Sequence, residues 1–175
     1  MSTTLPPTTL KGLESPAQDR HGLWARRAFL TTLVTFLVAA LVGLLGVRST
    51  TTSDSADGWT LDLEYASVAR SGLDVPFTAT VTHDGGLGEK VTLALTGTYL
   101  DIYETQGFHP EPDSTTRDAD TLYLVFEAPP AGDTLTVTYD AYVQPAAKRG
   151  ADGTLSVLDE GRPVVTVDLD TRVWP

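Results

Sequence analysis

The longest alternating stretch of the chain runs from residue 135 to residue 143 and reads LTVTYDAYV. Every second side chain in it is apolar, so an extended strand would place one face in a core and the other in water. The same period recurs in shorter runs, which lie at 61–65, 77–81, 91–95, 122–126, 155–157 and 165–173. Thr and Val are frequent in these runs, as they are in strands generally.

Turn residues separate the runs, as at Asp84-Gly85-Gly86 and Glu160-Gly161, and no long helical period interrupts them. The pattern predicts a mainly β domain over residues 59–175, an antiparallel immunoglobulin-like β-sandwich of roughly seven or eight strands. The chain has no cysteine, so the Cys–Trp–Cys signature of true immunoglobulin domains is missing. The order of the strands does not follow from the pattern.

A second decisive stretch is the uncharged run at residues 28–47, which reads AFLTTLVTFLVAALVGLLGV. As a helix it would be roughly 30 Å long, the thickness of the hydrocarbon core of a bilayer. It exceeds the apolar region of a signal peptide and is followed by poor cleavage sites. We therefore expect an uncleaved, single-pass transmembrane helix that serves as a signal anchor.

The charges beside this run predict its orientation. Arg26 and Arg27 precede it, and positive charge next to a span stays in the cytoplasm. We expect a plasma-membrane protein with a disordered cytoplasmic tail at 1–27, a polar linker at 48–58 and the β domain outside. In the alternative interpretation, Arg26-Arg27-Ala28-Phe29-Leu30 resembles the twin-arginine export signal and sends the domain out of the cell.

Charge also divides the chain. Residues 1–48 carry five Lys/Arg and two Asp/Glu, whereas residues 49–175 carry seven Lys/Arg and twenty-one Asp/Glu. A domain this acidic repels nucleic acid, so we expect no nucleic-acid partner. The acidity either keeps the domain soluble or matches it to a basic partner or to cations.

Small residues recur along the apolar run at every fourth position. Thr31, Thr35, Ala39 and Gly43 would form one ridge on a helix. Such ridges let two helices approach closely in lipid, so this face is a candidate for packing on a second copy or on another membrane protein. Small residues are common in such helices, and the alignment also fits chance.

The longest stretch without clear alternation runs from residue 97 to residue 120. It contains Tyr99, Tyr103, Phe108 and His109, the aromatic content of a recognition surface. We expect either an exterior contact loop or a set of aromatic side chains that cap the core.

Few residues outside the apolar run support catalysis. Only His83 and His109 are available as bases, there is no thiol, and no Gly-x-Ser-x-Gly sequence occurs. We expect no enzyme, no cofactor and no zinc or copper site, and we expect His83 to be a solvated turn residue. Calcium is the open alternative because carboxylates recur at Asp113, Asp118, Asp120, Asp168 and Asp170.

Three further stretches carry a resemblance to a known group of proteins. They read LDIYETQGFHPEPDS from residue 100, LVFEAPPAGDTLTVTYDAYVQP from residue 124 and VLDEGRPVVTVDLDTRVWP from residue 157. From about residue 60 onward the chain resembles small signal-anchored envelope proteins of high-GC bacteria. The resemblance implies no catalytic residue, and it implies a small multi-pass membrane protein as the partner.

Together these observations favour a non-catalytic, membrane-anchored accessory or interaction protein. Its β domain would dock on a membrane or envelope partner. The alternative is a binding module for an envelope ligand such as a glycan or calcium.

Overall fold

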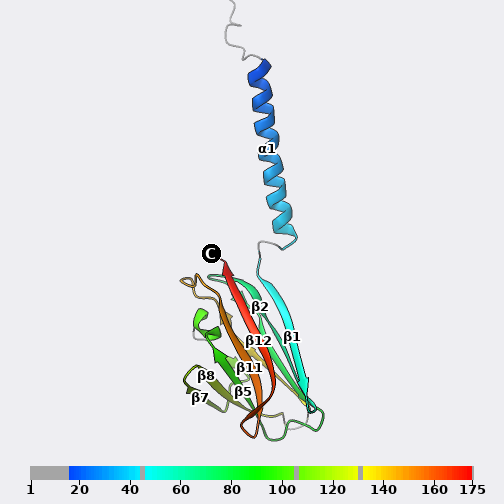
Figure 1. Ribbon diagram of the computed structural model, residues 1–175, viewed down its shortest axis with the longest axis vertical. Coiled ribbons are helices and arrows are strands. Elements are labelled where there is room, and N and C mark those ends of the chain that lie inside the picture. The colour runs from blue at the N-terminus through cyan, green and yellow to red at the C-terminus, as the bar shows by residue number, and fades with distance from the viewer. Residues whose placement is uncertain (1–15, 44–45, 105–106, 130–131, 175) are drawn as a thin grey trace, which may run out of the picture. The chain divides into compact units, whose positions relative to one another are not determined.

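The computed structural model describes residues 16–43, 46–104, 107–129 and 132–174. The chain divides into two compact units, Met1–Leu45 and Gly46–Pro175. The helix of the first unit is α1, Pro16–Leu41 (Figure 1). Its stretch Arg20–Leu41 is long and apolar enough to cross a membrane, by length and composition.

The bounds of α1 differ from the predicted span. The helix begins at Pro16, inside the tail expected to be disordered, because residues 17–27 include good helix formers such as Ala, Gln, Arg and Leu. Proline is well tolerated at the first helical position. The helix ends at Leu41, and Gly43 follows with φ +74°, the left-handed conformation that commonly terminates helices.

The second unit is mainly β. The described residues form twelve strands, more than the seven or eight expected. They are β1 Arg48–Ala56, β2 Trp59–Arg70, β3 Asp74–Val75, β4 Phe77–His83, β5 Lys90–Gly97, β6 Phe108–His109, β7 Ser114–Asp118, β8 Thr121–Glu127, β9 Thr134–Tyr139, β10 Ala141–Tyr142, β11 Ala151–Asp159 and β12 Arg162–Trp174. A short 3-10 helix, η1 Tyr99–Ile102, follows β5.

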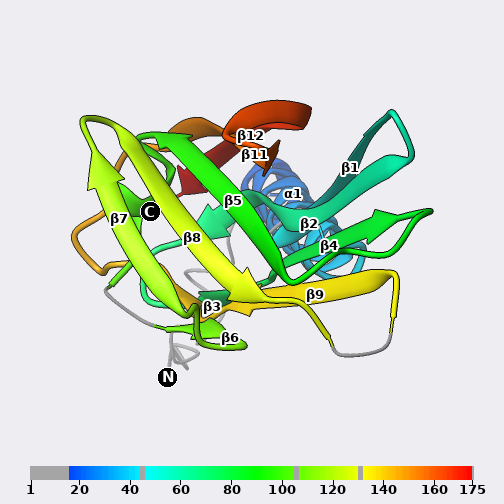
Figure 2. The ribbon, with the colours of Figure 1, turned by 90° about the horizontal axis from the view of Figure 1, so that it is seen from below.

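Ten of the strands form one sheet, in the order β6-β9-β4-β2-β12-β11-β5-β8-β7, with β1 paired to β2 outside this path. The strand β12 joins the two halves: it runs antiparallel to β11 up to Thr171, and its last three residues pair in parallel with β2. The sheet therefore curls continuously around one core, as Figure 2 shows. The expectation of an entirely antiparallel sandwich is wrong at β12.

The predicted linker at 48–58 is also wrong, because most of it is strand β1. Asp57 and Gly58 have φ values of 52° and 81° and connect Ala56 directly to its partner Trp59. Two central residues with positive φ make the tight turn whose twist suits a hairpin, and Asp-Gly is one of the pairs that favour it. Most side chains of β1 are exposed, which is why the strand shows no alternation.

The inward faces predicted from the alternation are confirmed. Each apolar position of those runs is buried, with one exception: Leu122 on β8 is only half-buried. The core also takes in Tyr99 of η1, which is fully buried. Tyr99 can lie this close to the sheet because Gly153 of β11 has no side chain, and a Cβ there would meet the Thr96 carbonyl oxygen and Tyr99.

Candidate functional site

The exception at Leu122 marks a cleft at the open side of the curled sheet. The strands β6 and β7 end the strand order, so the sheet does not close between them (Figure 2). A cleft of about 910 Å³ lies there, lined by residues of η1, β6, β7, β8 and β9.

The floor of the cleft is apolar. Leu100, Phe108 and Leu122 line it and are half-buried, packed on the edge of the core. The ring of Phe108 lies 4.6 Å from the ring of Tyr139, centroid to centroid, at an angle of 33°. These side chains leave apolar surface that a ligand group could cover, which is how small binding pockets gain affinity.

The rim of the cleft carries charges of both signs. Asp101 and Glu111 contribute carboxylates, and Arg117 contributes a guanidinium, all of them exposed. On β7, Thr115 and Arg117 stand opposite Leu124 and Leu122 of β8, on the face that lines the cleft. Inward-facing charge on an edge strand is one way in which proteins limit unwanted sheet pairing.

The strand β7 is itself an unusual element. All five of its side chains are exposed, and within residues 46–104, 107–129 and 132–174 its one partner strand is β8. Its other edge therefore presents backbone N–H and C=O groups to solvent, as edge strands do. The strand β7 is not predicted from the sequence because STTRD has no apolar alternation; the available signal is its hairpin partner, the run at 122–126.

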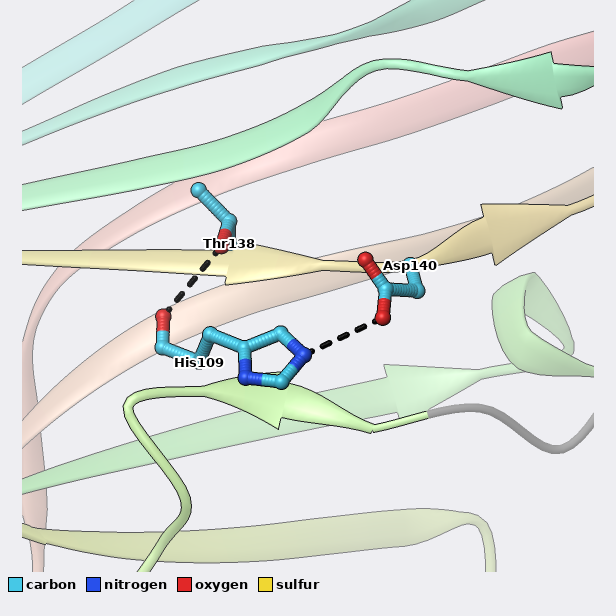
Figure 3. A network of polar contacts seen from close by, with 3 residues as sticks. All are labelled: His109, Thr138 and Asp140. Atoms are coloured by element: carbon cyan, nitrogen blue, oxygen red, sulfur yellow. Dashed lines mark hydrogen bonds and ion pairs between the residues drawn. The ribbon is translucent and has the colours of Figure 1, made fainter.

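A polar contact holds β6 against β9 at the side of the cleft (Figure 3). The His109 Nε2 and Asp140 Oδ2 atoms are 3.1 Å apart, and Thr138 Oγ1 donates to the His109 carbonyl oxygen at 3.3 Å. Both His109 and Asp140 are exposed. The two bonds join β6 to β9 and orient the His109 side chain.

The four predicted contact residues divide between core and cleft. Phe108 and His109 line the cleft, as an exterior contact surface requires. Tyr99 and Tyr103 are 0% and 3% exposed, and the Tyr103 hydroxyl donates to the Tyr99 hydroxyl at 2.9 Å, so both belong to the core, although Tyr103 also lies at the wall of the cleft. They cap the core, which was the alternative. Burial raises the pKa of both phenols, so they stay neutral.

The candidate calcium carboxylates do not come together. Asp113 is bound by the Lys90 ammonium at 2.6 Å, on the outside of the sheet. Among the residues that the structure describes, no group of three or more His, Asp or Glu side chains could hold a metal ion. His83 is not simply solvated as expected: its ring stacks on Trp59 at 4.2 Å and its Nδ1 lies 2.7 Å from the Gly86 carbonyl oxygen.

The candidate packing face of the membrane helix is shorter than predicted. Thr31, Thr35 and Ala39 lie on α1, where Thr35 Oγ1 donates to the Thr31 carbonyl oxygen at 2.9 Å. Gly43 lies beyond the end of the helix and so does not belong to the ridge. Arg26 and Arg27 also lie on α1 and are exposed.

Comparison with known proteins gives little further information. No protein-family model matches the chain, and no curated protein sequence matches it. Among solved structures, it aligns with the crystal structure of a DUF4466 family protein from Parabacteroides merdae ATCC 43184, with 12% identity and a TM-score of 0.39. The alignment covers 71% of this chain and 42% of that one, so the chain spans less than half of its length. A likeness this distant carries no argument about fold or function.

Proposed function

We propose that this protein is a non-catalytic, membrane-anchored interaction protein whose β unit binds an extended segment of a membrane or envelope partner. The observation that carries the proposal is the cleft between β6 and β7, with its apolar floor and the exposed edge of β7 beside it. The partner class rests on the helix α1 and on the resemblance to signal-anchored envelope proteins.

In this proposal α1 crosses the plasma membrane once. Arg26 and Arg27 keep the N-terminus in the cytoplasm, and the acidic β unit lies outside. The immunoglobulin-like sandwich stays a prediction at the finer level; a curled sheet whose two halves share one core is compatible with it.

The cleft suits an added strand. An extended segment can pair its backbone with the free edge of β7, and alternate side chains then point into the cleft. An apolar side chain would cover Leu100, Phe108 and Leu122, while Arg117 and the rim carboxylates would select charged neighbours. Main-chain pairing supplies affinity in this mode, and the pocket supplies specificity.

Site-specific photo-crosslinking in native membranes tests the proposal. A benzophenone amino acid at Thr115, in the cleft, should capture a distinct protein that mass spectrometry identifies. The same probe at Thr136 is the control, since Thr136 is also an exposed strand threonine but lies away from the cleft. Leu122→Asp should abolish capture at Thr115. A chain that is recovered alone from both positions would refute the proposal.

A second function is favoured by one detail, the half-buried ring of Phe108 in a cleft with a polar rim. Sugar rings also bind to aromatic faces flanked by carboxylates, so an envelope glycan would fit the same cleft. Titration with cell-wall glycan fragments, followed by the amide resonances of β6 and β7, separates the two. Saturable shifts that Phe108→Ala removes would favour the glycan.

A further inference from the structure

One end of the β unit differs from the rest in charge and in exposed apolar surface. It is the end at which the chain enters the unit, and we call it the Arg48 end. Arg48 begins β1 and stands in register with Val68 of β2, as does Arg172 of β12. Trp174, the last residue of β12, stands in register with Arg70.

A loop brings two more basic residues to the same end. Ser71 Oγ donates to the Ala147 carbonyl oxygen at 2.7 Å, so the loop that follows β10 is fastened beside the end of β2. Lys148 and Arg149 come directly after Ala147, and both are exposed. Ala151 then pairs with Thr171 of β12, which fixes the other side of this loop.

The Arg48 end is far less acidic than the remaining unit. Segments 46–48, 70–74, 147–150 and 170–174 contain five basic residues and two acidic ones, Asp74 and Asp170. Two more acidic residues border these segments: Asp152 stands in register with Asp170, and the Glu104 N–H donates to the carbonyl oxygen of Tyr142, the partner of Asp74. The rest of residues 46–175 contains three basic residues and seventeen acidic ones, so most of the basic residues of a strongly acidic unit lie at this one end.

The exposed apolar side chains lie at this end too. Among the described residues of the β unit, the large hydrophobic side chains that are exposed are Leu73, at 46%, and Trp174, at 49%. Tryptophan is enriched at membrane–water interfaces because its ring is apolar and its N–H is polar. Basic side chains beside it complement anionic head groups and extend their charges into the interface.

The connection to α1 keeps the Arg48 end near the membrane. Arg48 is seven residues beyond Leu41, the last residue of the helix, and seven residues span at most ~25 Å. We propose that the Arg48 end docks on the surface of an anionic bilayer, with Leu73 and Trp174 in the head-group layer. This inference rests on the transmembrane placement of α1 in the proposed function, and it requires no partner protein.

The absence of cysteine from the chain makes a direct test simple. Four single-cysteine variants of the full chain, each labelled with the fluorophore NBD, are reconstituted into phosphatidylcholine vesicles with or without phosphatidylglycerol. Leu73→Cys and Trp174→Cys report on the Arg48 end, Ser55→Cys reports on the exposed far end of β1, and Phe36→Cys reports on α1.

In vesicles with phosphatidylglycerol, the labels at Leu73 and Trp174 should show blue-shifted emission and protection from an aqueous quencher, while the label at Ser55 shows neither. In the opposite outcome, the quencher reaches the labels at Leu73 and Trp174 as readily as the label at Ser55, while the label at Phe36 lies in the hydrocarbon. This result would refute docking and leave the transmembrane placement of α1 intact. If the label at Phe36 is itself in water, α1 does not cross the membrane, and the docking inference, which depends on that placement, is also refuted.

Charge variants test the electrostatic part. Lys148→Gln with Arg149→Gln should lower the ratio of docked to undocked units by about fivefold for each charge removed, the effect expected of one basic residue near an anionic surface. Arg162→Gln is the matched control, since Arg162 is exposed but lies outside the Arg48 end. Equal effects of the two changes would overturn the inference.

Discussion

Tyr99 shows how a single residue joins the two halves of the sheet. Its ring lies 6.3 Å from that of Tyr65 on β2 and 5.8 Å from that of Phe77 on β4, and its Cβ lies beside Gly153 on β11. Aromatic pairs at such distances contribute about 1 kcal/mol each beyond their burial. The position of Tyr99 therefore depends on a glycine from another strand.

Gly153→Ala should destabilise the β unit by about 2 kcal/mol or more, because the new methyl group would meet the backbone oxygen of Thr96, which cannot move without breaking the β5–β11 pairing. Gly132→Ala is the control, since the nearest atoms there would be 4.0 Å from the added carbon. Urea unfolding of both variants measures the difference. Equal urea midpoints for the two variants would show that the structure around Gly153, including η1, can shift to accept the added methyl group.

The two buried phenols predict a loss of stability at high pH. An unfolded tyrosine ionises near pH 10, whereas burial raises the pKa of Tyr99 and Tyr103 in the folded chain. The unfolded state thus releases protons first, and the free energy of unfolding falls as the pH rises above about 10. Unfolding in urea from about pH 8 to pH 11 measures this slope.

The paired change Tyr99→Phe and Tyr103→Phe should flatten that slope, since it removes both ionisable hydroxyls. Tyr142→Phe serves as the control, because Tyr142 lies on β10, outside the hydrogen-bonded pair. If the free energy of unfolding of the double variant falls with pH as steeply as that of the wild type, groups other than these two phenols cause the loss of stability.

Single elements show how far the sequence predicts the fold. The alternation identified the inward faces of β2, β4, β5, β8, β9, β11 and β12, because each of these strands has one face in the core. Strands β1 and β7 were not predicted, since exposed side chains on both faces leave no alternation of apolar and polar residues. For β1 a signal existed in the pair Asp57-Gly58, which favours a hairpin turn.

The candidate site was predicted in part for a related reason. The aromatic loop was found, but an aromatic side chain carries the same sequence signal whether it caps a core or faces a ligand. Tyr99 and Tyr103 turn inward because η1 follows β5 immediately, and Phe108 and His109 reach the edge as strand β6. The cleft itself depends on Leu122 and β7, which the curl of the sheet places opposite them.

The helix α1 gives a prediction at the same scale. If Thr31, Thr35 and Ala39 form a packing face, Thr35→Leu with Ala39→Leu should lower association in the membrane by about an order of magnitude, since bulk separates the helices. Phe36→Leu with Ala40→Leu is the matched control on another face. Energy transfer between labelled copies in vesicles measures association of the chain with itself, and equal transfer in both variants would dismiss the face.

At the scale of the whole β unit, β12 is the element that makes one sheet of two halves. Its alternation continues without a break through Val167, Leu169, Thr171 and Val173, so nothing in the pattern marks where it changes partner. The change occurs at Thr171, which is fully buried and whose hydroxyl donates to the Ala66 carbonyl oxygen of β2. The change of partner thus coincides with a contact between residues 105 positions apart, which the alternation of one strand cannot encode.

Because both halves share β12 and one core, the β unit should unfold in a single transition. In a Trp24→Phe background, tryptophan fluorescence and the far-ultraviolet circular dichroism of the strands should give the same urea midpoint. Val173→Asp should lower both midpoints together, since it buries a charge at the junction. Two separated transitions would mean that the halves fold independently.

The pairing of β1 with β2 also has a mechanical consequence. The strand begins at Arg48 and runs away from that point, with nine residues of β1 in register with β2. If the partner holds the β unit while the bilayer pulls on α1, the tension acts along β1 and shears all of these pairs at once, instead of peeling them one by one. The polar segment that resembled a linker would then be the strongest part of the tether under load.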